Sequence, residues 1–262
     1  MEEVILVCED SPEGILTAVY RAYEWKLVPE HTRVQTGADD LYLFARYREV
    51  VTDAVLAGKV ARTIKRRFGE DAWEDICFAM AAEAGEKGQA VYRTIASGLA
   101  GRVKGRLMSG LADDDIRRTF ELSRHVHQEA HRMKMFVRFR ELEGGLLFAR
   151  IEPDANVLEF VMPHFADRFP LENFVIVDVR RGLAGIHESK RDWFLVRMDG
   201  QERERFSSLV LRYSEEELEM AELFRHFCIS LGIKERKNLK LQQQFLPLKY
   251  RRFMTEFDGN GQ

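Results

Sequence analysis

The chain of 262 residues has few cysteines, no long apolar run and no familiar catalytic motif such as GxSxG. Its three cysteines, Cys8, Cys77 and Cys228, lie far apart and form no CxxC pair. Odd, widely spaced cysteines are typical of free thiols in a reducing compartment, and such a chain holds no iron–sulfur cluster or structural zinc on cysteines. The start MEEVILVCED lacks a basic region and an apolar signal stretch. These absences predict a cytoplasmic protein without a cofactor of its own and without a membrane partner.

The composition is that of a soluble globular protein, with 45% hydrophobic and 32% charged residues. We expect a helix-rich part over residues 1–134. Residues 135–262 are expected to hold a small antiparallel sheet, C-terminal helices and a basic tail, either as a second part or within one continuous domain. The predicted fold class is α+β, with a mostly helical N-terminal half, a mainly antiparallel sheet in the middle and helices at the end.

The N-terminal half combines two short strands with several helices. Ser11 is suited to cap a helix that has Pro12 in its first position, and this helix is expected to run to about Trp25. Helical spacing then dominates up to Met133. The two strands are expected over residues 4–7 and 43–51, with a polar linker over residues 30–40 between them.

The middle of the chain changes to strand-like alternation. Residues 135–141 and 146–151 alternate around Glu143-Gly144-Gly145, which predicts a hairpin. Ser214 and Glu217 have the spacing of a capping box that begins a late helix, and Gly232 is expected to end it. Between them we expect a short helix over residues 161–169 and strands over residues 174–179 and 183–187.

The C-terminal stretch from Lys234 to Arg252 concentrates positive charge in a chain of net charge −3. It contains seven basic residues, one acid, several glutamines and the aromatic Tyr250. Such a segment suggests a polyanion partner, although a solvated, salt-bridged helical tail has the same composition.

A second basic stretch, HRMKMFVRFR over residues 131–140, contains no acid. If residues 135–141 form a strand, Arg138 and Arg140 share one face with Phe136. Paired arginines beside an aromatic ring suit phosphates and stacked bases. The outer face of an ordinary amphipathic hairpin has the same pattern.

The candidate catalytic residues are His131, His164 and Asp167. His127 and His131 are four apart, which is the spacing of two metal-binding imidazoles on one helical face, but the HExxH arrangement is absent. We therefore predict no metal site. His164 and Asp167 lie within one helical turn beside Arg168, where they suit either proton transfer beside an anion or a hydrogen-bonded structural trio.

Several long motifs resemble a bacterial family described as probable DNA metabolism proteins, a domain of unknown function. They are EDSPEGILTAVY (residues 9–20), the run from EAHRMKM to FARIEP (129–153), PHFADRF (163–169) and the closing IKERKN (233–238). The resemblance covers nearly the whole chain. One departure is Asp10, which stands where the family usually has glycine.

The resemblance implies a role in DNA repair. Genes of this family lie beside radical-SAM proteins similar to DNA-repair photolyase or spore photoproduct lyase, and some members are fused to a uracil-DNA glycosylase domain. DNA, a radical-SAM photolyase-like protein and uracil-DNA glycosylase are therefore the implied partners, and the neighbouring protein would hold the cluster.

The sequence leads to a first hypothesis and two alternatives. The first is a DNA-binding accessory protein that works with the radical-SAM partner; the alternatives are an enzyme acting on a nucleic-acid lesion and a protein–protein adaptor. Whether the chain is an enzyme stays open. The candidate nucleic-acid-binding residues are Arg132, Lys134, Phe136, Arg138, Arg140, Arg168, Arg236, Lys237, Asn238, Lys240, Tyr250, Arg251 and Arg252.

Overall fold

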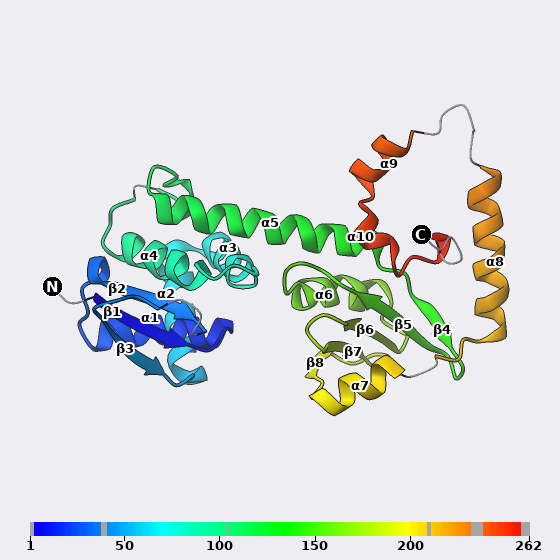
Figure 1. The fold of residues 1–262 in the computed structure, drawn as a ribbon, viewed down its shortest axis with the longest axis horizontal. Helices are drawn as coiled ribbons and strands as arrows, with labels where there is room; N and C mark the ends of the chain where they lie inside the picture. Colours follow the sequence, from blue (N-terminus) through cyan, green and yellow to red (C-terminus); the bar gives the residue numbers. More distant parts are fainter. Residues whose placement is uncertain (1–2, 38–40, 104, 209–210, 232–237, 258–262) are drawn as a thin grey trace. The chain divides into compact units, whose positions relative to one another are not determined.

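The computed structural model describes residues 3–37, 41–103, 105–208, 211–231 and 238–257 (Figure 1). The chain forms two compact units, unit 1 (Met1–Gln128) and unit 2 (Glu129–Gln262). Among the described residues, no helix combines the length and apolar character that crossing a membrane requires.

Unit 1 is built around a parallel sheet in the strand order β2-β1-β3. The central strand pairs on both sides, with Val4 opposite Thr32 on one neighbour and Arg46 on the other. Ile5 and Leu6 are both fully buried, so the sheet is covered on both faces, as parallel sheets usually are. The strands are β1 (Glu3–Cys8), β2 (Thr32–Thr36) and β3 (Ala45–Val50).

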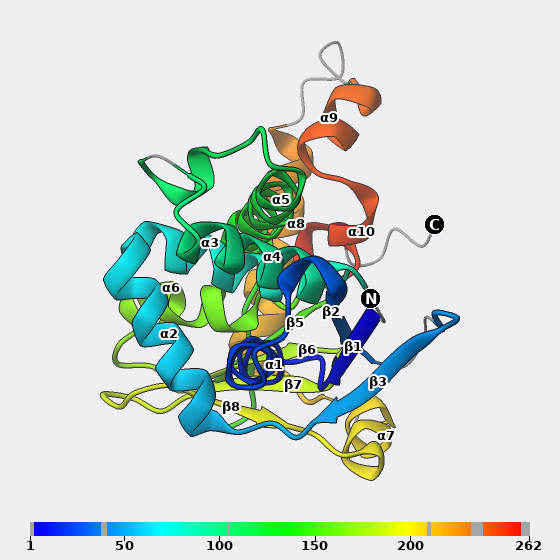
Figure 2. The ribbon, with the colours of Figure 1, turned by 90° about the vertical axis from the view of Figure 1, so that its left-hand side faces the viewer.

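Helices surround this sheet. The helix α1 packs along β1 and against α2, and α4 packs on β2 (Figures 1 and 2). Their buried faces meet in a core that includes Ile15, Ile64, Tyr92 and Ile95. The helices are α1 (Pro12–Glu24), α2 (Ala54–Phe68), α3 (Glu70–Met80), α4 (Lys87–Leu99) and α5 (Asp114–Phe136), with single turns η1 (Pro29–His31) and η2 (Leu107–Ser109). Since α5 ends at Phe136, it continues from unit 1 into unit 2.

The junction between β1 and α1 is tightly built. The Ser11 hydroxyl accepts a hydrogen bond from the Gly14 amide at 3.0 Å, with Pro12 in the first helical position. A side chain at Gly14 would place its Cβ 2.3 Å from the carbonyl oxygen of Glu9. The Asp10 carboxylate forms an ion pair at 2.6 Å with the ammonium of the buried Lys87, at the start of α4. The residues of the EDSPEG motif therefore position α1 and α4 on the sheet.

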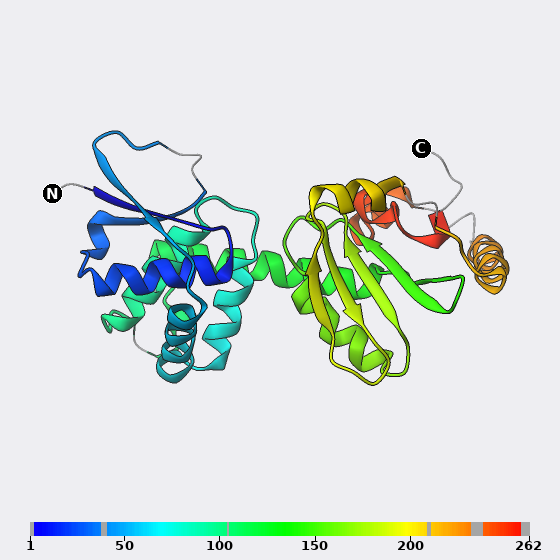
Figure 3. The ribbon, with the colours of Figure 1, turned by 90° about the horizontal axis from the view of Figure 1, so that it is seen from below.

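Unit 2 contains a mixed sheet in the strand order β4-β5-β6-β7-β8 (Figure 3). The pair β5–β6 is parallel and the other pairs are antiparallel. The parallel pair needs a crossover, which α6 (Leu158–Arg168) provides while packing on β6 and β7. The strands are β4 (Arg140–Leu142), β5 (Leu146–Ile151), β6 (Phe174–Asp178), β7 (Leu183–His187) and β8 (Phe194–Arg197).

Aromatic rings fill the core between α6 and the sheet. The ring of Phe139 lies 5.1 Å from Phe165, 5.6 Å from Phe169 and 5.4 Å from Phe174, each in an edge-to-face arrangement. Such contacts add to the gain from burying the rings. The remaining elements of unit 2 are α7 (Gly200–Ser208), α8 (Glu215–Ser230), α9 (Leu239–Phe245), α10 (Leu248–Arg251) and the turn η4 (Thr255–Phe257).

The structure confirms the α+β fold class, the first strand, the cap at Ser11 and the hydrogen bond from the Glu217 amide to the Ser214 hydroxyl at 3.1 Å. The predicted hairpin around Glu143-Gly144-Gly145 is present as β4 and β5, but its first strand begins at Arg140 and not at residue 135. Helix α5 continues to Phe136, because Ala130 and Met133 bury its apolar face, and the Val137 amide still bonds to the Met133 carbonyl. The polar linker over residues 30–40 contains β2, and Gly232 lies outside the described residues.

Candidate nucleic-acid interface

The two arginines predicted to share a strand face both follow the end of α5, and of the two only Arg140 lies in a strand. Arg138 lies before β4, donates a hydrogen bond to the Met135 carbonyl at 2.9 Å and pairs with Glu256 at 2.8 Å. Arg140 begins β4, pairs with Glu217 at 3.0 Å and stacks on the Tyr213 ring at 3.6 Å. Both guanidiniums therefore stabilise unit 2 through carboxylates of its own, and little of their charge is available to a phosphate.

A buried carboxylate, Glu129, organises the next group of candidates. It is fully buried and accepts hydrogen bonds from the Asp154 amide at 3.1 Å and the Tyr250 hydroxyl at 2.5 Å. The Lys249 ammonium lies 3.5 Å away and also pairs with Asp154, and Arg132 approaches Glu129 to 3.9 Å. A buried carboxylate requires such partners, so this cluster connects α5 to the C-terminal segment.

The titration of this cluster reflects its packing. Burial raises the pKa of Tyr250, and the hydrogen bond to Glu129 adds to that effect. Burial by itself would lower the pKa of Lys249, but hydrogen bonds to Asp154 and Tyr250 and the charge of Glu129 together raise it. Lys249 therefore stays protonated and Tyr250 stays neutral at physiological pH.

The two aromatic rings proposed to stack on bases pack against each other instead. The centroids of Phe136 and Tyr250 are 5.3 Å apart, and only 7% of Tyr250 is exposed. A ring covered to this extent offers no face to a nucleobase in this arrangement.

The rest of the C-terminal segment is held in a similar way. Arg252 pairs with Glu152 at 2.5 Å, and Arg251 donates to the Leu246 carbonyl at 3.3 Å and 3.2 Å. Asn238 caps α9 by accepting a hydrogen bond from the Leu241 amide at 3.1 Å, and Lys240 is exposed. Two further candidates, Arg236 and Lys237, lie outside the described residues.

The candidate acid–base residues lie on α5 and α6. His131 and Asp167 are exposed, as is His164, whose ring contacts Phe165 at 5.0 Å between centroids. Partial burial and the charges of Lys134 and Arg168 lower the pKa of His164, against the opposite influence of Asp167. The His164 imidazole is therefore neutral at pH 7. Within the described part of the chain, no group of three or more His, Cys, Asp or Glu side chains is arranged to hold a metal ion.

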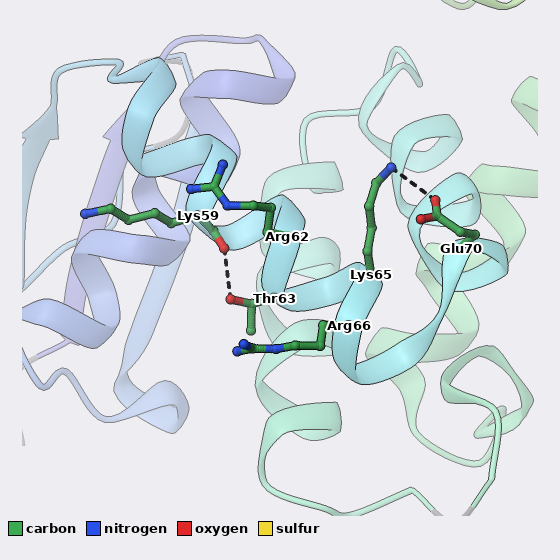
Figure 4. A pocket seen from close by; sticks show the side chains of 6 residues that line it. All are labelled: Lys59, Arg62, Thr63, Lys65, Arg66 and Glu70. Atoms are coloured by element: carbon green, nitrogen blue, oxygen red, sulfur yellow. Dashed lines mark hydrogen bonds and ion pairs between the residues drawn. The ribbon is translucent and has the colours of Figure 1, made fainter.

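A further exposed concentration of cations lies on α2 of unit 1, and it is not among the candidate nucleic-acid-binding residues that the sequence suggested. Five basic residues occur in this helix without any acid, at positions 59, 62, 65, 66 and 67. On its outer side lies an open hollow of about 630 Å³ (Figure 4). The hollow is lined by Lys59, Arg62, Thr63, Lys65, Arg66 and Glu70.

The side chains of the hollow divide into two groups. Lys59, Arg62 and Arg66 extend to the same side of α2, whereas Lys65 turns toward Glu70, with which it pairs at 3.1 Å (Figure 4). Over the ranges that the structure describes, no carboxylate pairs with Arg62, Arg66 or Arg67, and all three are exposed. We call Lys59, Arg62 and Arg66 the α2 basic face.

The α2 basic face has the chemistry of a phosphate-binding surface. Lys59, Arg62 and Arg66 follow each other at intervals of three and four residues, so the row extends about 10 Å along the helix. Guanidiniums bind phosphate oxygens in pairs, and an ammonium adds a point charge. The signal was visible in the sequence as cations opposite the apolar positions Val60 and Ile64.

The fold and this surface define an α+β protein with a basic helical face. A family model described as a domain of unknown function, DUF4130, matches residues 85–256, and the chain belongs to that family. No curated protein matches the chain. The matched segment begins just before α4, so the α2 basic face precedes it in the sequence.

Proposed function

We propose that this chain is a DNA-binding accessory protein in DNA repair that works beside a radical-SAM, photolyase-like partner. The observation that carries the DNA-binding part is the α2 basic face, whose cations are exposed and of one sign. The direction toward DNA repair, including the radical-SAM partner and uracil-DNA glycosylase, rests on the family resemblance of the motifs.

Most cations of unit 2 are expected to contribute less to DNA binding than the α2 basic face. Arg138, Arg140 and Arg252 pair with acids, so they stabilise the fold rather than grip phosphates. Lys134, Arg168 and Lys240 remain as secondary phosphate contacts. Nucleic-acid affinity depends strongly on how many phosphates are neutralised, so the α2 basic face is expected to dominate the salt dependence.

The test is fluorescence anisotropy of labelled single- and double-stranded oligonucleotides at several salt concentrations. We expect the triple variant Lys59→Gln/Arg62→Gln/Arg66→Gln to bind at least about tenfold more weakly, with a log–log salt slope lower by about 2–3, because each lost phosphate contact lowers the slope by about 0.9. The loss should be similar for different sequences, since phosphates carry no base information.

A matched control separates a local contact from a general charge effect. The variant Arg117→Gln/Arg118→Gln/Arg124→Gln removes three positive charges from α5 in unit 1, where Arg117 and Arg118 already pair with acids. It should bind like the wild type. Equal weakening in both triple variants would contradict the assignment to α2, and no binding by the wild type at low salt would contradict DNA binding altogether.

A second candidate function, the protein–protein adaptor, is favoured by α8. Met220, Leu223, Phe227 and Leu231 follow helical spacing along α8 and its C-terminal end and are each more than half exposed. Apolar stripes of this kind are typical of partner surfaces. Retention of the radical-SAM partner in high salt and nuclease, together with no oligonucleotide binding, would favour the adaptor.

A further inference from the structure

An apolar groove adjoins the α2 basic face. It lies between α1, α2 and α4 of unit 1 and has a volume of about 160 Å³. Lys59 and Thr63 line both the groove and the basic hollow, so the two adjoin each other along α2. The ligand that contacts the cations is therefore expected to reach the groove.

The groove presents aromatic surface to solvent. Its walls include Tyr20 and Tyr23 from α1, Phe68 from α2 and Leu99 from α4. Tyr23 is 44% exposed and Leu99 40%, so both side chains are accessible to a ligand. The Lys59 ammonium lies 5.4 Å from the centre of the Tyr20 ring, so a cation already lies beside an aromatic ring at the rim.

The Phe68 ring can form a wall of the groove because Gly98 leaves room for it. A Cβ added at Gly98 of α4 would lie 2.7 Å from the Cζ atom of Phe68. The missing side chain lets Phe68 lie against α4 and keeps it as part of the groove. The shape of the groove therefore follows from the packing of α2 on α4.

We propose that this groove binds one unstacked base of a single-stranded nucleic acid whose neighbouring phosphates lie on the α2 basic face. The proposal rests on the proposed function and names the kind of strand that this face takes. Aromatic rings beside a row of cations are the two components of single-strand binding surfaces, since every base has a face that stacks on a ring. The cations at the rim favour a polyanion over an uncharged apolar ligand.

The strand state follows from the same geometry. A base within a duplex is stacked on both faces and reaches a side groove only when it leaves the helix. An unpaired base is free of that cost. The groove therefore selects single-stranded DNA, or an unpaired position within a duplex.

The experiment compares two single-stranded oligonucleotides of equal length. One is oligodeoxythymidine, and in the other every base is replaced by an abasic residue. Both carry the same phosphates. We expect the full-length wild type to bind the strand with bases about 5- to 150-fold more tightly, which corresponds to stacking of one base. The variant Tyr23→Leu should lose most of this ratio and keep its affinity for the abasic strand. The control Tyr47→Leu, at a tyrosine of β3 that is 39% exposed, should keep the ratio.

A second measurement tests the groove even if the Tyr23→Leu variant fails to fold. A 2-aminopurine base in the strand loses fluorescence when it stacks on an aromatic ring, so wild-type protein should quench it, and Leu99→Gln should reduce the quenching at saturating protein. Equal binding of the two strands by the wild type, or an unchanged ratio in a folded Tyr23→Leu variant, would overturn the base-binding groove while leaving DNA binding intact. If neither strand binds at low salt, the proposed function and this inference both fall.

Discussion

Gly14 shows how a single residue governs the start of the fold. It lies in the first turn of α1, where the chain returns so closely that an added Cβ would meet the Glu9 carbonyl at 2.3 Å. Backbone atoms cannot move aside as a flexible side chain can. Glycine is therefore required by the approach of two backbone segments rather than by an unusual dihedral angle.

We expect Gly14→Ala to lower the free energy of unfolding by about 1–3 kcal/mol, the usual cost of forcing extra atoms into a packed site. A matched control is Gly58→Ala in α2, where the nearest atom to the added Cβ is the Arg62 guanidinium at 3.5 Å. That change should be neutral or stabilising by up to about 1 kcal/mol, because alanine favours a helix. Urea unfolding measures both, and a stable Gly14→Ala protein would contradict the close approach.

At the scale of elements, the C-terminal segment shows what charge counting predicts and what it misses. The sequence shows that cations are concentrated near residues 249–252, and it left open whether they bind a polyanion or form salt bridges. It contained no sign that Glu129, Glu152 and Asp154 would lie beside them, because these acids are about a hundred positions away in the chain. Partners that meet only through tertiary packing cannot be inferred from local composition.

The same limit applies to α5 and α2. The alternation of residues 135–141 resembled a strand, but the buried face of α5 extends the helix to Phe136. In α2, both the apolar stripe and the opposing cations could be predicted from spacing alone. Their accessibility could not, because it depends on which acids lie nearby in the folded chain.

The attachment of the C-terminal segment to α5 is testable with a double-mutant cycle. We expect Glu129→Gln and Tyr250→Phe each to destabilise unit 2 by about 1–3 kcal/mol. Tyr250→Phe leaves a buried carboxylate oxygen without its donor, and Glu129→Gln removes the negative charge that Lys249 and Tyr250 face. The double variant should lose less than the sum, with a coupling of about 0.5–3 kcal/mol.

Tyr213→Phe serves as the control for this cycle, since the Tyr213 ring stacks on Arg140 and is not among the contacts described for Glu129. Its effect should add to that of Glu129→Gln. Equal coupling for Tyr213 and Tyr250 would contradict the specific contact between Glu129 and the C-terminal segment.

At the scale of the whole molecule, the segment that the family model matches does not coincide with either folding unit. The match begins at residue 85, but α4 belongs to unit 1 and contributes Val91, Tyr92 and Ile95 to its core. A fragment of residues 85–256 would lack β1 to β3 and expose this face to water.

We therefore expect the 85–256 fragment to aggregate or to unfold without a cooperative transition, because its α4 residues lose their apolar contacts. A fragment of residues 129–262 keeps the Glu129 cluster and the five-stranded sheet, and it should unfold cooperatively. Calorimetry and gel filtration of both fragments make the comparison. A well-folded 85–256 fragment would contradict the assignment of α4 to the core of unit 1.

The ion pair between Asp10 and Lys87 has a consequence for substitutions at residue 10. The Asp10 carboxylate neutralises a lysine whose side chain is only 7% exposed. A buried ammonium without a countercharge is costly. An uncharged residue at position 10 is therefore expected to remove this countercharge, and replacement of Lys87 by an apolar residue of similar length would relieve the resulting cost.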